Sequence, residues 1–195
     1  MGALTCELKP TASTGDTREL VDYIVERCPG KNDTEIRSAL VKALRRFLTD
    51  SKAWREPLTP LPELAGEPAY RFASASSGLI HTVCEVRSRY GTVPPPEYIC
   101  DDGRTVMFHE AIPVDSFPYA AMVPERGDDH APARIFQKYG EAVCNGALHE
   151  LVANGQLNAA TSWKALYDNA VTEALLDAQP RTAGTIRLDF GMEVI

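Results

Sequence analysis

The sequence lacks grouped cysteines. Its five cysteines, Cys6, Cys28, Cys84, Cys100 and Cys144, are scattered, odd in number and form no CxxC pair. A disulfide framework or a structural zinc site requires ligands at close and regular spacing. We therefore expect reduced thiols in a cytoplasmic setting.

The motifs of several enzyme classes are also missing. The chain has no GxxxxGK[ST] or GxGxxG segment to hold phosphates and no GxSxG turn to present a nucleophile. An HExxH zinc motif fails because Ala153 stands where the second histidine after His149 would be. We predict no catalytic residues, no metal ligands and no cofactor.

One group of residues keeps a remote enzymatic alternative open. His109 and Glu110 lie across a predicted hairpin from Cys100 and Asp102 and could form a metal or acid–base cluster, as in a small metal-dependent hydrolase. Ordinary loop chemistry is the stronger interpretation, because a free cysteine and turn carboxylates need no catalytic role.

Long apolar runs and excess positive charge are absent as well. No segment approaches membrane-spanning length, and residues 1–10 lack the basic and apolar regions of a signal peptide, so we expect a soluble, intracellular product. With 27 acidic and 20 basic residues, the formal net charge of −7 disfavours a general electrostatic grip on DNA.

Four segments have helical patterns. The clearest runs from Asn32 to Thr49, where Asn32 or Asp33 can cap the first turn and Glu35 supports it. Its apolar stripe comprises Ile36, Ala39, Leu40, Ala43, Leu44, Phe47 and Leu48, and its opposite face carries Arg37, Lys42, Arg45 and Arg46. The other segments are a short helix from Asp16 to Pro29, a long one from Ala131 to Ala153, and one from Trp163 to Leu175.

The middle of the chain, residues 57–127, differs in composition. Ten prolines exclude a long helix, and short strands are predicted at Tyr70–Phe72, Ile80–Val86, Tyr98–Cys100 and Thr105–Phe108. The sequence therefore predicts an α+β fold in one domain, residues 1–195. A four-helix bundle, residues 16–56 and 131–179, would carry a small antiparallel β insertion and an extended C-terminal arm, residues 184–195.

The predicted arm alternates polar and apolar residues. A lone strand cannot satisfy its backbone hydrogen bonds, so we expect it to pair with a sheet of its own chain or of a neighbour. Its apolar residues are the predicted binding residues: Ile186, Leu188, Phe190, Met192 and Val194.

Two stretches carry a resemblance to a known family. Residues 39–56, ALVKALRRFLTDSKAWRE, resemble the head-to-tail adaptor proteins of tailed bacteriophages, which are related to the connector and tail tubular families. Residues 66–72 are similar to the family's next element, and residues 139–152 with the helix at 163–176 form the second match. The loop at 156–163 departs from the family pattern.

The resemblance implies a structural virion protein rather than an enzyme. Such proteins form a ring, commonly twelvefold, that docks beneath the portal after genome packaging and extends the DNA channel. The implied partners are the portal protein, further copies of the chain (twelve in such a ring), a downstream tail or nozzle protein, and DNA that passes without sequence-specific binding. The arm, Ile186 to Val194, would bind the portal, and the location would be the virion neck after assembly in the host cytoplasm. A tail tubular or gatekeeper protein lower in the neck is the alternative.

Overall fold

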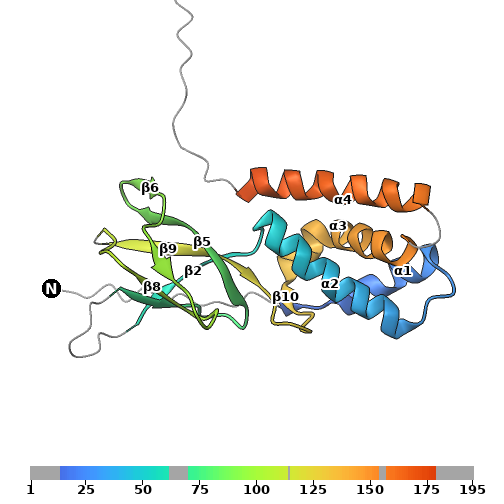
Figure 1. Ribbon diagram of the computed structural model, residues 1–195, viewed down its shortest axis with the longest axis horizontal. Coiled ribbons are helices and arrows are strands. Elements are labelled where there is room, and N and C mark those ends of the chain that lie inside the picture. Colours follow the sequence, from blue (N-terminus) through green and yellow to red (C-terminus); the bar gives the residue numbers. More distant parts are fainter. Residues whose placement is uncertain (1–13, 62–69, 114, 154–156, 179–195) are drawn as a thin grey trace, which may run out of the picture.

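The computed structural model describes residues 14–61, 70–113, 115–153 and 157–178. Its helices gather at one end of an elongated molecule and its strands at the other (Figure 1). The helical elements are the 3₁₀ turn η1 (Thr17–Leu20), α1 (Val21–Arg27), α2 (Asp33–Ser51), α3 (Ala133–Val152) and α4 (Leu157–Ala178).

The predicted second helix is confirmed as α2. The Asn32 side chain accepts a hydrogen bond from the Glu35 backbone N–H at 2.8 Å, and the Glu35 carboxylate accepts one from the Asn32 N–H at 3.2 Å. This capping box satisfies two of the N–H groups that a helix start leaves without partners. The helix ends at Ser51, and the C-cap residue Lys52 has a φ of 52°, in the left-handed region. All seven residues of the predicted apolar stripe are buried.

The strands form two four-stranded antiparallel sheets and one two-stranded pair. The first sheet has the order β2 (Arg55–Pro57), β9 (Ser116–Val123), β5 (Leu79–Ser88) and β6 (Gly91–Val93). The second has the order β3 (Thr59–Pro60), β4 (Arg71–Ala73), β8 (Thr105–Phe108) and β7 (Tyr98–Ile99). Separate from both, β1 (Thr14–Gly15) pairs with β10 (Ala131–Pro132), which lies between the β lobe and the helices.

The two four-stranded sheets close on each other into one β lobe, residues 55–123. On one side a single residue, Leu58, separates β2 from β3, so one extended segment passes from the first sheet into the second. On the other side the Ile80 N–H on β5 donates to the Gly103 carbonyl at 2.6 Å, and the Val83 N–H donates to the Tyr98 hydroxyl at 3.0 Å. The two sheets therefore meet along β2 and β3 on one side and between the first half of β5 and the β7–β8 segment on the other, while β6 pairs with the last three residues of β5.

The prediction of a four-helix bundle with a small insertion is wrong. The first of the four helices, α1, has only seven residues, because Pro29 and Gly30 stop it soon after the 3₁₀ turn. The strands are no minor insertion either, since they make two sheets of four strands each. The helices cannot form a closed core of their own, because β9 contacts α2 and one hydrophobic cluster joins both ends of the molecule. The predicted arm, residues 184–195, lies outside the described residues.

The joint between α2 and β2 shows how that common core is built. Trp54 is 2% exposed and lies one residue before β2. Its backbone carbonyl accepts from the Met122 N–H on β9 at 2.7 Å, and its ring N–H donates to Glu56 at 2.6 Å. An alanine-sized side chain at Gly78 would come within 2.5 Å of the Trp54 ring, so this glycine allows β5 to begin close to the indole.

Candidate functional site

A cleft of about 580 Å³ lies where the β lobe meets α3 and α4. All four strands of the first sheet and both helices contribute to its walls. Its charged and aromatic lining consists of Arg55, Arg87, Tyr119, Arg134, Lys138, Tyr139 and Asp177.

On the sheet side of the cleft, one buried carboxylate organises two arginines. Glu85 on β5 is 3% exposed, and its Oε1 atom accepts from Arg87 Nε at 2.7 Å and lies 3.7 Å from Arg55 Nη1. The Arg87 guanidinium also lies 4.1 Å from the centre of the Tyr119 ring, a cation–π distance. A buried carboxylate requires such partners to offset its loss of hydration. The two arginines are therefore held in fixed positions on the cleft wall.

On the helix side, Arg134 and Lys138 stand one turn apart on α3. The Lys138 ammonium donates to Asp177 Oδ2 on α4 at 2.6 Å, and this hydrogen bond raises the pKa of Lys138. The Tyr139 hydroxyl donates to the same carboxylate oxygen at 3.2 Å. Arg134 donates to the Arg55 backbone carbonyl at 3.2 Å, which joins the helix to the sheet across the cleft. Within the described part of the chain, Arg134 forms no ion pair.

The cleft is thus a positive region on an acidic protein. Four cationic side chains, Arg55, Arg87, Arg134 and Lys138, meet two carboxylates, Glu85 and Asp177, so the local balance is two positive charges on a chain of net charge −7. A concave surface of one sign concentrates its potential and selects a partner of the opposite sign. The arrangement can bind an anionic group or an acidic loop.

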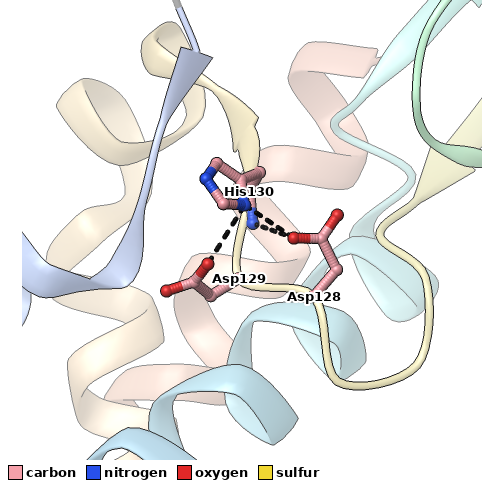
Figure 2. Close-up of side chains that lie close together, drawn as sticks. All are labelled: Asp128, Asp129 and His130. Atoms are coloured by element: carbon pink, nitrogen blue, oxygen red, sulfur yellow. Dashed lines mark hydrogen bonds and ion pairs between the residues drawn. The ribbon is translucent and has the colours of Figure 1, made fainter.

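A second polar group lies in the loop before β10. Asp128, Asp129 and His130 bring one possible ligand atom each to within 4.8 Å of one another, the one such trio of histidine, cysteine or acidic side chains among the residues described (Figure 2). His130 Nδ1 lies 2.6 Å from Asp128 Oδ1 and 3.1 Å from Asp129 Oδ1. The hydrogen bond with Asp128 is the main cause that raises the pKa of His130. These contacts within the trio account for its geometry without a metal.

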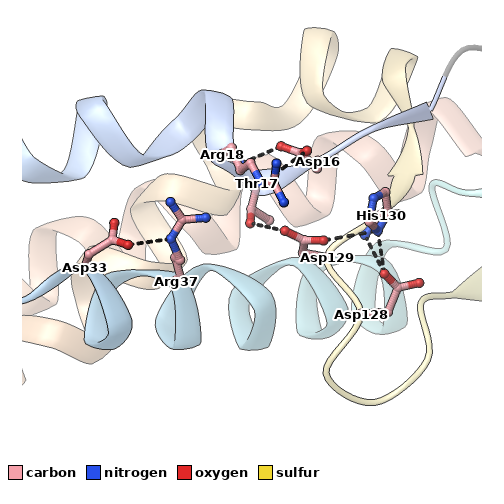
Figure 3. A network of polar contacts seen from close by, with 8 residues as sticks. All are labelled: Asp16, Thr17, Arg18, Asp33, Arg37, Asp128, Asp129 and His130. Atoms are coloured by element: carbon pink, nitrogen blue, oxygen red, sulfur yellow. Dashed lines mark hydrogen bonds and ion pairs between the residues drawn. The ribbon is translucent and has the colours of Figure 1, made fainter.

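The trio also belongs to a wider network that fixes the start of the described chain (Figure 3). The Thr17 hydroxyl, fully buried, donates to Asp129 Oδ2 at 3.2 Å. Asp16 caps η1 by accepting from the Arg18 backbone N–H at 2.8 Å. Because these contacts hold η1 against the loop that leads to β10, the network has a structural explanation.

The residues of the enzymatic alternative are not gathered into one ligand set. Asp102 accepts hydrogen bonds from the backbone N–H groups of Thr105 and Arg104, which lower the pKa of its carboxyl group. Burial raises the pKa of the Cys100 thiol. His109 and Glu110 are exposed beyond the end of β8. The predicted binding residues Ile186, Leu188, Phe190, Met192 and Val194 lie outside the described residues.

The cleft has no counterpart among the sites predicted from the sequence. Its cations come from β2, β5 and α3, up to 83 positions apart, and only the fold brings them together. The one local signal is the spacing of Arg134 and Lys138, which places both on one face of a helix. No such signal connects them with Arg55 or Arg87.

No family model matches the chain, and no curated protein matches its sequence. None of the helices in the described part of the chain combines the length and apolarity needed to cross a lipid bilayer. The four cysteines in that part, Cys28, Cys84, Cys100 and Cys144, are free thiols.

Proposed function

We propose that the chain is a head-to-tail adaptor of a tailed bacteriophage. It forms a ring that docks under the portal and extends the DNA channel to the tail. In this proposal α2, α3 and α4 build the ring wall, the β lobe faces the next tail component, and residues 184–195 bind the portal. The packaged DNA passes through without sequence-specific contacts.

The observation that best supports this proposal is the form taken by residues 39–56, the first of the stretches that carry the resemblance. They make up the second half of α2, the turn at Lys52 and the start of β2. Phe47, Leu48 and Trp54 within this stretch are all buried at the junction of helices and sheets. The stretch is thus a continuous piece of the core, as the family's helix that leads into strands would require.

The charge distribution gives a second, independent support. Ring subunits need lateral faces that recognise each other, and a basic cleft on an otherwise acidic chain is suited to such recognition. A net negative charge also keeps DNA from adhering to a channel wall.

The proposal is tested by mixing the full-length chain with purified portal rings of the same phage and sedimenting the mixture. We expect the chain to sediment with the portal as a ring, and a variant that lacks residues 184–195 to remain in the supernatant. Two results together would contradict the proposal. The chain would stay monomeric in the presence of portal rings, and deletion of residues 184–195 would leave virion assembly unchanged.

Electron cryo-microscopy of assembled necks separates the adaptor from a tail tubular or gatekeeper protein. An adaptor contacts the portal directly, whereas the alternative lies one component further down. Density for this chain only below another ring would favour the alternative.

A further inference from the structure

The β lobe carries a second depression, on the second of its two four-stranded sheets. This acidic groove has a volume of about 330 Å³ and is lined by Arg71, Ile99, Asp101, Asp102, Thr105 and Met107. On β8, Val106 and Phe108 are buried in the lobe while Met107 is exposed, so Met107 points away from the lobe interior. Met107 stands in register with Arg71 on β4 and with Ile99 on β7, and the three form one row across the outside of the second sheet.

The positions of the two depressions follow from the sheets to which their strands belong. Tyr119 on β9 lines the basic cleft, and Met107 on β8 lines the acidic groove. The strand β9 belongs to the first sheet and β8 to the second, and no strand pairing joins them. The cleft and the groove are therefore separate surfaces of the lobe.

The charges of the two surfaces are complementary. The lining of the acidic groove has two carboxylates, Asp101 and Asp102, against one guanidinium, Arg71. Arg104 is the one other charged residue of the β7–β8 turn, residues 100–104. Arg104 is itself paired with Glu125. The basic cleft beside the first sheet has four cations against two carboxylates.

The β7–β8 turn at the groove is also rigid. Asp102 accepts from the Thr105 N–H at 2.6 Å and from the Arg104 N–H at 2.8 Å, and the Gly103 carbonyl accepts from Ile80 on β5. Gly103 has a φ of 67°, which favours glycine and lets the chain reverse there. Asp101, in the same turn, is exposed. A preorganised turn loses little conformational entropy when it is bound.

We propose that the basic cleft of one copy binds the acidic β7–β8 turn of a second copy, so that copies associate head to tail through their β lobes. The cleft volume corresponds to roughly twenty water molecules at about 30 Å³ each. The cleft is therefore large enough to admit a tight turn of a second copy. Because the two surfaces differ, the contact is heterologous, and repetition closes a ring when the rotation between copies allows it. Closure into a ring rests on the proposed function. The contact between two copies does not depend on it.

The first experiment locates the contact directly. A full-length chain with photoreactive p-benzoylphenylalanine in place of Thr92, an exposed and uncharged cleft residue, is mixed with ¹⁵N-labelled wild-type chain and irradiated over a concentration series. We expect mass spectrometry to find crosslinks from position 92 to labelled peptides within residues 97–108. Crosslinks only to other regions, no crosslinked dimer at the highest soluble concentration, or crosslinks to an added DNA duplex in place of a second copy would each overturn the proposal.

A charge exchange in the same assay tests the electrostatic basis. Each substitution is made in both the photoreactive and the labelled chain. Arg134→Glu or Asp101→Lys alone should then lower the yield of this crosslink at least about tenfold, because like charges face each other. The double variant should recover most of the yield, since every contact again joins opposite charges. Lys164→Glu on α4, outside the cleft, is the matched control and should leave the yield unchanged. Single variants without effect, or a double variant that loses more than either single one, would overturn the proposal.

The two proposals can fail separately. If the crosslink forms but the chain does not sediment with portal rings, the contact between copies stands and the adaptor function falls. If portal-bound rings form while position 92 crosslinks elsewhere, the adaptor function stands and the contact proposed here is wrong.

Discussion

The packing of Gly146 gives a prediction in which two effects of known size oppose each other. Glycine within a helix costs about 1 kcal/mol relative to alanine, so Gly146→Ala in α3 should gain that amount from helix propensity alone. A Cβ atom at this position would, however, lie 2.9 and 3.0 Å from two ring carbons of Tyr167 on α4 and 3.3 Å from the Ala43 Cβ on α2. The Tyr167 ring cannot move aside, because it is 4% exposed and packs edge-on against Phe47.

Overpacking in such a site costs about 1–3 kcal/mol, and three close contacts place this substitution in the upper part of that range. We expect Gly146→Ala to lower the free energy of unfolding by about 1–2 kcal/mol after the propensity gain is subtracted. Gly140→Ala in the same helix is the control, because its Cβ would meet only the end of the Leu20 side chain at 3.1 Å. That variant should be as stable as wild type or up to about 1 kcal/mol more stable. Urea unfolding followed by circular dichroism measures both, and a Gly146→Ala protein at least as stable as wild type would refute the packing argument.

Two further predictions concern charged groups. Glu85→Ala leaves Arg55, whose side chain is 16% exposed, without its buried counter-charge, while the Arg87 side chain, 43% exposed, can turn to water. We expect the free energy of unfolding in urea to fall by about 1–3 kcal/mol, less than for a wholly buried pair. An unchanged unfolding midpoint would contradict the role assigned to Glu85. The imidazole of His130 should titrate by NMR above its ordinary pKa of 6.5, since the hydrogen bond with Asp128 favours the charged form. The stabilisation it provides is therefore complete below pH 6.5 and is lost as pH rises through the raised pKa. Asp128→Asn should bring the titration midpoint back down, and equal midpoints in both proteins would exclude this cause.

The helices could be predicted from sequence because their signals are local. Asn32 and Glu35 lie one turn apart, and the apolar stripe of α2 recurs at helical spacing, so each residue's role is defined by near neighbours. The start of α4 was placed at Trp163, six residues too late, because Leu157 and its neighbours give no clear apolar stripe.

The strands were predicted only in part. Short strands at Tyr70–Phe72, Ile80–Val86, Tyr98–Cys100 and Thr105–Phe108 correspond to β4, β5, β7 and β8. The eight-residue strand β9 was missed because Pro118 lies within it and proline is usually confined to sheet edges. Here the Pro118 carbonyl still accepts from the Leu58 N–H at 2.8 Å, so the strand remains joined to its neighbour. Without β9, neither the first sheet nor the cleft could be predicted.

The place of β9 in the first sheet also determines when that sheet can form during synthesis. It lies between β2 and β5, yet both of those strands leave the ribosome before it does. Until residue 123 has emerged, β2 has no partner and β5 is paired on one side only, by β6 over its last three residues. The helices can start to form locally, whereas the β lobe must wait for its central strand. A nascent chain of this protein therefore carries exposed strand edges through the synthesis of most of its β lobe, the interval in which it is most open to aggregation or to a chaperone.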